Sequence, residues 1–287
     1  MKMLVSHESP LELLEDSLKY NDYQYCLVHL MEEDEEYKDW FLNVRKRFGA
    51  DVLLDNSIFE LGESFDPAKY AYWLEEIKPN FYIVPDVLEN ARETMDKWTE
   101  WELMHQPADT NALRIGVVQG KDWNDLVECY EFMSSEADYI AISFDYSYYQ
   151  HTGIGGNKLE RWCTGRQRFI QQLIDEGKWN WNKPHHLLGC SLAKEFRYYV
   201  DKDITNIRSC DTSNPVVAAL HGLQYNSDQG LTTKPSTMLC DLINADVNDD
   251  VRELTTYNTT MFKKILHRDP EPKLWSMDGC DAVGAAV

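Results

Sequence analysis

The sequence predicts a single (β/α)₈ barrel, and three observations support this fold class. Short apolar segments of strand-like composition alternate with longer segments in which apolar residues recur at helical spacing. This alternation is typical of a parallel sheet whose strands are connected by helices. Eight strands can be counted, the number that closes a barrel, and several of them end on a polar side chain. The length of 287 residues suits one barrel, and no change in composition marks a linker.

The predicted strands are apolar runs, most of them rich in Val, Ile, Leu and aromatic residues, that end at polar or turn-forming positions. They cover residues 1–7, 25–31, 52–55, 81–84, 113–118, 139–143, 186–189 and 207–210. A helical segment follows most of them, so the strands are expected to run parallel.

The predicted helices are identified by apolar residues three and four positions apart and by their end signals. Gly49 ends an acidic helix, and Asp66 followed by Pro67 begins the next one. The helices cover residues 10–18, 32–49, 66–77, 88–104, 123–133, 166–176 and 192–200, and the last begins at Val216. The aromatic and glycine-rich segment 145–158 is predicted to be a functional loop. We expect residues 1–225 to form the barrel and residues 226–287 a helical extension packed on it.

The charge distribution limits the kinds of partner. A formal net charge of −21 at pH 7 argues against a protein that binds nucleic acid with its whole surface. A local contact is still compatible, because exposed charges more than about 8 Å apart are largely screened at physiological salt. Two basic segments, 158–168 and 263–268, are candidates, although each taken alone is explained as a solvated surface. No apolar run is long enough to cross a membrane, and seven scattered cysteines predict reduced thiols in a cytoplasm.

Polar residues follow five of the predicted strands, whose ends in a parallel barrel open onto one face, here called the barrel mouth. These residues are Asp55, Asp86, Gln119, Asp145 and Asp211. The pair Asp55 and Asp211 suits cleavage of a glycosidic bond, in which one carboxylate attacks or stabilises the sugar carbon and the other moves a proton. Asp86 and Gln119 match the edge of a heterocyclic base, on which Phe59 is placed to stack. The structural alternative is that these aspartates cap helices or tie turns.

No metal or cofactor is predicted. Cys240, His267 and Cys280 lack the close-paired spacing of a zinc site. His185 and His186 are interpreted as a structural pair rather than as metal ligands.

Five short motifs resemble those of the tRNA-guanine transglycosylases, in that family's order, over residues 20–220. DNSIFELG (55–62) resembles the family's Asp-Ser-Gly-Gly-aromatic-Gln segment, and VPDVL (84–88) resembles its base-reading aspartate segment. IGVVQG (115–120) resembles its strand ending in Gln-Gly, and KPHHLLG (183–189) its Lys-Pro-His-Tyr-Leu-Met-Gly segment. IRSCDTSNP (207–215) resembles the segment with its nucleophilic aspartate. The resemblance lies in the series, since each short motif is weak by itself.

The resemblance implies a base-exchange enzyme that needs no cofactor, because one N-glycosidic bond replaces another. Asp211 would be the nucleophile on C1′ of the target nucleotide, and Asp55 the general acid and base. A free 7-deazaguanine would then take the place of the expelled guanine. The substrate-binding residues would be Phe59, Asp86, Gln119, Gly120, Ser143 and Gly189.

The sequence departs from the family in two places. The family's Cys-x-Cys-x-x-Cys zinc segment is missing, and ISFDYSYY (142–149) replaces a Gly-Gly-Leu-Ala run that contacts the base. The zinc-free form resembles the phage and bacterial DNA-guanine transglycosylases, so DNA is the favoured substrate. Its phosphates would contact Lys158, Arg161, Arg166 and Arg168. The alternatives are exchange in tRNA, a nucleoside hydrolase with the same aspartate pair, or a catalytically silent binding subunit; no oligomeric state is predicted.

Overall fold

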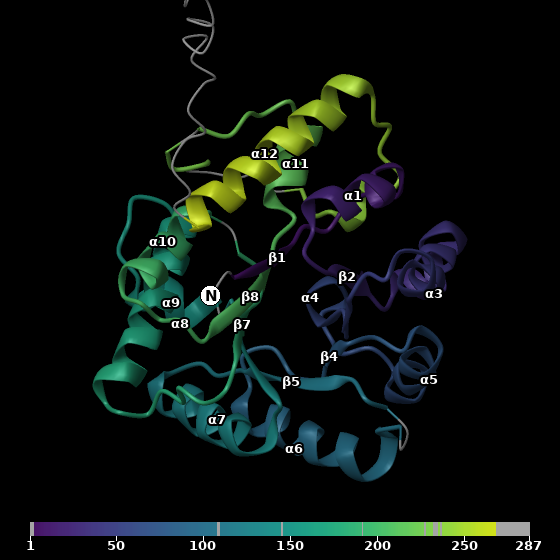
Figure 1. The fold of residues 1–287 in the computed structure, drawn as a ribbon. Helices are drawn as coiled ribbons and strands as arrows, with labels where there is room; N and C mark the ends of the chain where they lie inside the picture. Colours follow the sequence, from purple (N-terminus) through teal and green to yellow (C-terminus); the bar gives the residue numbers. More distant parts are fainter. Residues whose placement is uncertain are drawn as a thin grey trace, which may run out of the picture.

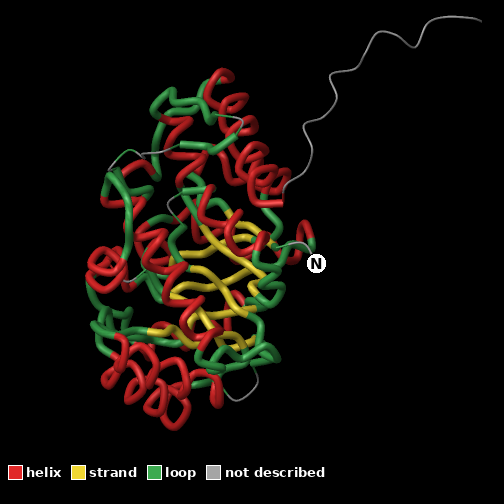
Figure 2. Tube along the Cα trace, turned by 90° about the vertical axis from the view of Figure 1, so that its left-hand side faces the viewer, coloured by secondary structure: helices red, strands yellow, loops and turns green. Residues whose placement is uncertain are grey.

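An eight-stranded parallel sheet forms the centre of the computed structural model, with helices around it (Figures 1 and 2). The structure describes residues 3–107, 110–144, 146–190, 192–226, 228–231, 235 and 237–267. The strands are β1 (Leu4–Ser6), β2 (Gln24–Leu27), β3 (Val52–Asp55), β4 (Phe81–Ile83), β5 (Leu113–Val118), β6 (Tyr139–Ile142), β7 (His185–Leu187) and β8 (Ile207–Asp211). Hydrogen-bonded neighbours follow the order β1-β8-β7-β6-β5-β4-β3-β2. The predicted (β/α)₈ barrel is therefore confirmed.

The barrel is nearly closed, and a side chain bridges the seam between β1 and β2. The backbone N–H of Asp22 donates to the Val5 carbonyl, and the Asp22 carboxylate accepts from the Val5 N–H, both at 2.9 Å. The same carboxylate lies 3.0 Å from the Nζ of Lys263. Asp22 therefore connects the first two strands to a helix near the C-terminus.

The helices connect and cover the strands. They are α1 (Leu14–Tyr20), α2 (Leu30–Glu33), α3 (Glu35–Phe48), α4 (Ile58–Leu61), α5 (Pro67–Ile77), α6 (Ala91–Glu100), α7 (Trp123–Glu136), α8 (Tyr146–Thr152), α9 (Lys158–Asp175), α10 (Lys194–Asp201), α11 (Asn214–Leu220) and α12 (Asp249–His267). Short helical turns occur at Leu11–Leu13, Trp101–His105 and Cys240–Leu242. The predicted end signals are present: Asp66 accepts a hydrogen bond from the N–H of Lys69 at the start of α5, and Gly49 ends α3 with φ of 69°.

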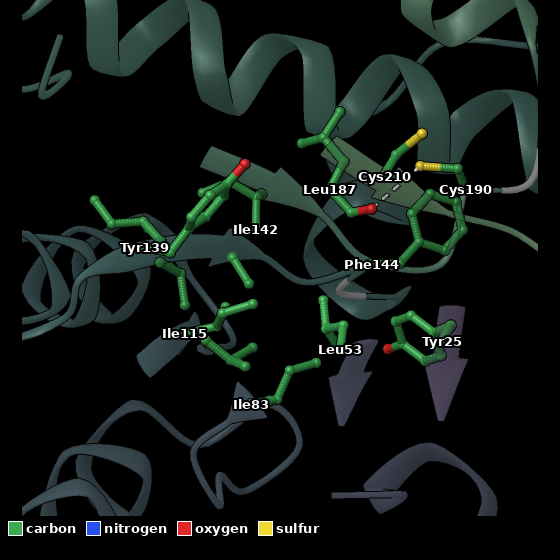
Figure 3. Close-up of a cluster of buried hydrophobic side chains, with 14 of the residues drawn as sticks. Tyr25, Leu53, Ile83, Ile115, Tyr139, Ile142, Phe144, Leu187, Cys190 and Cys210 are labelled. Atoms are coloured by element: carbon green, nitrogen blue, oxygen red, sulfur yellow. Dashed lines mark hydrogen bonds between the residues drawn. The ribbon is translucent and has the colours of Figure 1, made fainter. Parts of the chain in front are cut away.

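Side-chain alternation along the strands decides which residues face the barrel interior. Tyr25, Leu53, Ile83, Ile115 and Tyr139 come from five neighbouring strands and belong to one buried cluster (Figure 3). Asp55 is two positions after Leu53, and Gln119 is four positions after Ile115, so each shares the face of its apolar predecessor. The last inward positions of the strands are therefore polar, above an apolar interior.

Two predicted strands run at least two residues past the observed ends. The predicted strand 25–31 ends at Leu27, because the N–H of His29 donates to the Oγ of Ser57 at 3.2 Å and the chain turns into α2. The predicted strand 186–189 ends at Leu187, and Gly189 then adopts a left-handed φ of 61°.

The predicted loop 145–158 is largely helical, which corrects the sequence analysis. Residues Tyr146–Thr152 form α8, and α9 begins at Lys158 rather than at residue 166. The two helices pack closely, since a Cβ at position 165 would lie 2.3 Å from the carbonyl oxygen of Tyr149. Gly165 thus permits a helix contact that apolar periodicity does not reveal.

The C-terminal helix α12 packs on α10, α11 and α1 (Figure 1). Its Phe262 is fully buried, with the Phe196 ring at 5.6 Å and the His7 ring at 5.2 Å between centroids. The domain boundary at residue 225 stays a prediction. None of the helices in the described part of the chain is long and apolar enough to cross a membrane.

Candidate active site

Asp55 ends β3 and is almost fully buried at the barrel mouth. Its Oδ2 accepts a hydrogen bond from the Tyr25 hydroxyl at 2.5 Å, and its Oδ1 accepts one from the N–H of Ser57. Burial raises the pKa of Asp55 well above its usual range, and the charge of Glu60 acts in the same direction. The two hydrogen bonds lower this pKa, and the charge of Asp211 raises it further. A raised pKa favours the protonated carboxylic acid, which is the form that a general acid needs.

Asp211 ends β8 and has a different environment. Its Oδ1 accepts a hydrogen bond from Nε2 of His186 at 2.9 Å. The backbone N–H of Gly189 lies 3.1 Å from Oδ2 and 3.3 Å from Oδ1. The left-handed φ of Gly189 turns the chain after β7 so that this N–H points at the carboxylate. The Gly189 N–H can only donate, and His186 donates when its proton is on Nε2; among the described residues this setting suits an ionised carboxylate, which is the form that a nucleophile needs.

The two carboxyls lie at the same end of the barrel, within electrostatic range of each other. The charge of Asp211 raises the pKa of Asp55, and it also raises the pKa of Tyr25, whose hydroxyl binds Asp55. β3 and β8 are separated only by β1 and β2 around the barrel. The acids that the sequence places at the ends of the third and eighth strands therefore lie at the same end of the barrel, close enough for their charges to interact.

Glu60 is a third carboxyl at this mouth, and the sequence analysis did not select it. It lies on α4, and its Oε2 is buried with no hydrogen-bond partner among the described residues. Burial raises the pKa of Glu60 to about 7, and the charge of Asp211 contributes. A signal for it was present, because Glu60 follows Phe59 at the motif position where the resembled family has Gln.

Asp86 and Gln119 form a buried polar cluster at the ends of β4 and β5. The Oδ2 of Asp86 accepts from Nε2 of Gln119, and its Oδ1 accepts from Nδ2 of Asn56, both at 2.8 Å. The Oε1 of Gln119 accepts from the N–H of Glu89 at 2.9 Å. Burial raises the pKa of Asp86, while the bonds from Gln119 and Asn56 lower it. Sequence reasoning missed Asn56, whose partner comes from the next strand end.

The other predicted substrate-binding residues are spread around the same end of the barrel. The Phe59 ring on α4 is half exposed, whereas the Oγ of Ser143 is buried and donates to the Val118 carbonyl at 2.9 Å. Gly120 lies against α7, where an added Cβ would be 2.8 Å from the Leu126 nitrogen. Asp145 lies outside the described residues.

A small cavity lies beside Tyr25, next to the candidate site. Its volume is about 10 Å³, it is lined among others by His7 and Leu239, and it has room for about one water molecule. Within the described ranges, no three His, Cys, Asp or Glu side chains are gathered so that they could hold a metal ion.

The basic residues of α9 face different surroundings. Lys158 and Arg168 are exposed and Arg161 is partly exposed, and the Nζ of Lys158 lies 4.3 Å from the centre of the Trp162 ring. Arg168 also donates from Nη1 to the Thr152 carbonyl, and all three residues keep exposed surface on α9.

Arg166 is fully buried, so its predicted contact with nucleic acid is wrong. Its Nε and Nη2 donate to the Glu195 carboxylate at 2.7 and 2.9 Å, and its Nη1 donates to the Leu188 carbonyl at 2.6 Å. The Phe144 ring lies 4.7 Å from its guanidinium carbon. The guanidinium is thus surrounded by protein groups and has no surface for a phosphate.

Comparison with known proteins finds distant relatives among transferases that act on tRNA. The chain is 21% identical over 228 residues to queuine tRNA-ribosyltransferases of Streptococcus pneumoniae, including those of strains CGSP14, G54 and 70585. The match covers 79% of this chain and 51% of each relative. The similarity supports a place in the tRNA-guanine transglycosylase superfamily. The chain spans about half the length of the curated relatives that it matches, and no protein-family model matches it.

Proposed function

We propose that the protein is a base-exchange transglycosylase that replaces guanine in DNA by a 7-deazaguanine derivative. The observation that carries this proposal is the contrast between two buried carboxyls at one barrel mouth. Asp211 receives two N–H donors suited to a carboxylate, while burial and neighbouring charge hold Asp55 toward its protonated form. Two carboxyls with opposed environments are the usual arrangement for a nucleophile and a general acid.

In this reaction Asp211 attacks C1′ of the target nucleotide. The C1′–N9 bond breaks, its electron pair leaves with guanine, and Asp55 gives its proton to the leaving base. The incoming 7-deazaguanine then loses a proton to Asp55 and attacks C1′, and the electron pair of the ester bond returns to Asp211. Positive charge develops on the sugar in both steps, so the negative charge of the Asp211 carboxylate stabilises the transition states.

Asp86 and Gln119 are proposed to read the base, and Phe59 to stack on it. Asp86 and Gln119 hydrogen-bond each other, and binding of the base exchanges this bond for bonds to the purine edge. The exposed ring of Phe59 lies on the helix that follows Asp55. Gly120, Ser143 and Gly189 are proposed to line the same site.

DNA is the proposed substrate because the sequence lacks the zinc segment of the tRNA enzymes that it resembles. The target base must leave the duplex to reach the barrel mouth, which costs a few kcal/mol. Lys158, Arg161 and Arg168 are the proposed phosphate contacts that offset this cost.

The described cysteines are all free thiols, which supports the proposed cytoplasmic location.

The test is transfer of labelled base. The protein is incubated with duplex DNA and labelled 7-deazaguanine, and label is followed into DNA for the wild type, Asp211→Asn, and Asp39→Asn as a control on the exposed side of α3. We expect label in DNA with the wild type and Asp39→Asn, and none with Asp211→Asn. Incorporation that survives Asp211→Asn would show that the nucleophile is wrongly assigned.

The second candidate is exchange in tRNA, favoured by the name of the relatives. The same assay with tRNA and with free nucleosides separates the candidates. Label in tRNA but not in DNA would show that the substrate is tRNA rather than DNA. Release of base from nucleosides without exchange would indicate a hydrolase. If the protein neither incorporates label nor releases base with any of the three substrates, it is a binding subunit.

A further inference from the structure

Asp211 is the end of a row of four buried polar side chains drawn from three neighbouring strands. Nε2 of His186 lies 2.9 Å from Oδ1 of Asp211, and Nδ1 of His186 lies 2.8 Å from Oγ of Ser209. The Oγ of Ser209 lies 3.0 Å from the hydroxyl of Tyr139. His186 is 0% exposed, and Ser209 and Tyr139 are each 7% exposed, so water does not compete for these bonds.

The four groups can form a row of hydrogen bonds in which each group donates to the next, from Tyr139 to Asp211. An ionised carboxylate only accepts, so the proton must be on Nε2 of His186. In a neutral imidazole Nδ1 then accepts, and the Ser209 hydroxyl must donate to it. The oxygen of Ser209 is left to accept from the Tyr139 hydroxyl. Burial raises the pKa of Tyr139 to about 12, so this phenol keeps the proton that it donates.

We infer that Tyr139, Ser209 and His186 are positioning residues that fix the imidazole with its Nε2–H toward Asp211. This bond commits Oδ1, so Oδ2, which holds only a share of the Gly189 N–H, is the oxygen that attacks the sugar. The inference rests on the proposed function, because it assigns a role to the surroundings of the proposed nucleophile. His186 contacts Asp211 and not the substrate, and Ser209 and Tyr139 act through it.

The assignment has a consequence for the covalent intermediate. When Oδ2 bonds to C1′, Oδ1 becomes the carbonyl oxygen of a neutral ester, and it still accepts from His186. When the incoming base attacks C1′, the electron pair of the C1′–Oδ2 bond returns to Asp211 and the carboxylate is formed again. A hydrogen bond to a charged acceptor is stronger than one to a neutral acceptor. The row therefore favours the free carboxylate over the ester and promotes departure of Asp211 in the second step.

The experiment measures how much protein is held as the covalent adduct. Each protein is equilibrated with DNA and a fixed concentration of free guanine, and the ratio of adduct to free protein is read on a denaturing gel. The variants are His186→Phe, which removes the donor, His186→Tyr, which offers a phenol donor instead, and Ser209→Ala, which removes the partner of Nδ1. Ser17→Ala is the matched control, because it removes another buried hydroxyl, on α1.

We expect the adduct ratio to rise about tenfold and exchange to slow about tenfold in His186→Phe, because the charge-assisted bond to Asp211 is lost. In Ser209→Ala both quantities should change in the same directions but by less, because only the partner of Nδ1 is lost. His186→Tyr should return both quantities toward wild type, and Ser17→Ala should leave both unchanged. A merely structural role lowers the adduct ratio and the exchange rate together, and that result would overturn the inference.

A second measurement does not depend on activity. Proton–nitrogen correlation spectra of the eight histidine rings, with His186 assigned from the spectrum of His186→Phe, report which ring nitrogen carries the proton. We expect the Nε2–H form in the wild type and a gain of the Nδ1–H form in Ser209→Ala. A wild-type ring in the Nδ1–H form, or protonated on both nitrogens, would overturn the inference. If the wild type forms no adduct, the proposed function fails, and these spectra alone decide the inference.

Discussion

Removal of the Arg166 guanidinium should destabilise the fold rather than weaken nucleic-acid binding. Arg166 and Glu195 are both 0% exposed and share two hydrogen bonds of 2.7 and 2.9 Å. In Arg166→Ala the Glu195 carboxylate stays buried, and the Tyr199 hydroxyl at 2.8 Å still donates to it but cannot neutralise its charge. Breaking one side of a buried ion pair costs about 3–5 kcal/mol. For a chain of 287 residues, whose entropy of unfolding is about 0.6 kcal/mol/K, that loss corresponds to a melting temperature about 5–8 °C lower.

Thermal unfolding followed by circular dichroism measures this effect, with Arg168→Ala as the control. Arg168 is exposed on the same helix, so its removal should change the free energy of unfolding by no more than about 0.5 kcal/mol. The double variant Arg166→Met/Glu195→Leu should recover most of the loss, because apolar side chains of similar volume replace buried pairs at little cost. An Arg166→Ala protein that melts like the wild type but binds DNA more weakly would refute the reasoning.

Three further predictions concern the mouth and α9. The pKa of Glu60 lies near 7 in the folded protein and near 4.5 in the unfolded chain, so the wild type loses stability as pH rises between these values, and Glu60→Gln does not. Because Glu60 is partly exposed, we expect the variant to gain about 1–2 kcal/mol above pH 7 and nothing below pH 4.5, measured by urea unfolding at both ends. Phe59→Ala should leave stability unchanged, since the ring is 50% exposed, and raise KM for the free base about tenfold; an unchanged KM would exclude stacking. Replacing Lys158, Arg161 and Arg168 together by alanine should make the salt dependence of DNA binding weaker. If all three contact phosphates, the slope of the log association constant against log salt concentration should fall in magnitude by about 2.7. An unchanged slope would show that DNA binds elsewhere.

The barrel was predictable because its signals are local. Each strand is a short apolar run, and helix ends such as Asp66 and Gly49 carry the expected capping residues. The helix α8 was not predictable in this way, since its close approach to α9 depends on the absence of a Cβ at Gly165, a feature of packing rather than of periodicity.

The residues of the candidate site were predictable where each lies at the end of a single strand. A contact that joins two elements was not predictable. Asp55 and Asp211 follow from strand ends alone, whereas the bond between His186 and Asp211 joins β7 to β8. The misassigned Arg166 did carry a local signal. It lies four residues after Trp162 and three before Phe169, so helical spacing places it on the buried apolar face of α9.

Asp22 bonds to Val5 at the seam of the barrel and to Lys263 of α12, so α12 contributes to the closure of the barrel. Shortening the chain before α12 would keep all eight strands and both acids of the mouth, yet it would remove Lys263 from Asp22 and Phe262 from the ring of His7. We expect such a protein to loosen first between Val5 and Asp22, where backbone amide protons would exchange with solvent ahead of the rest of the sheet. The smallest piece able to fold by itself is therefore larger than the eight strands and their connections, and it extends into α12.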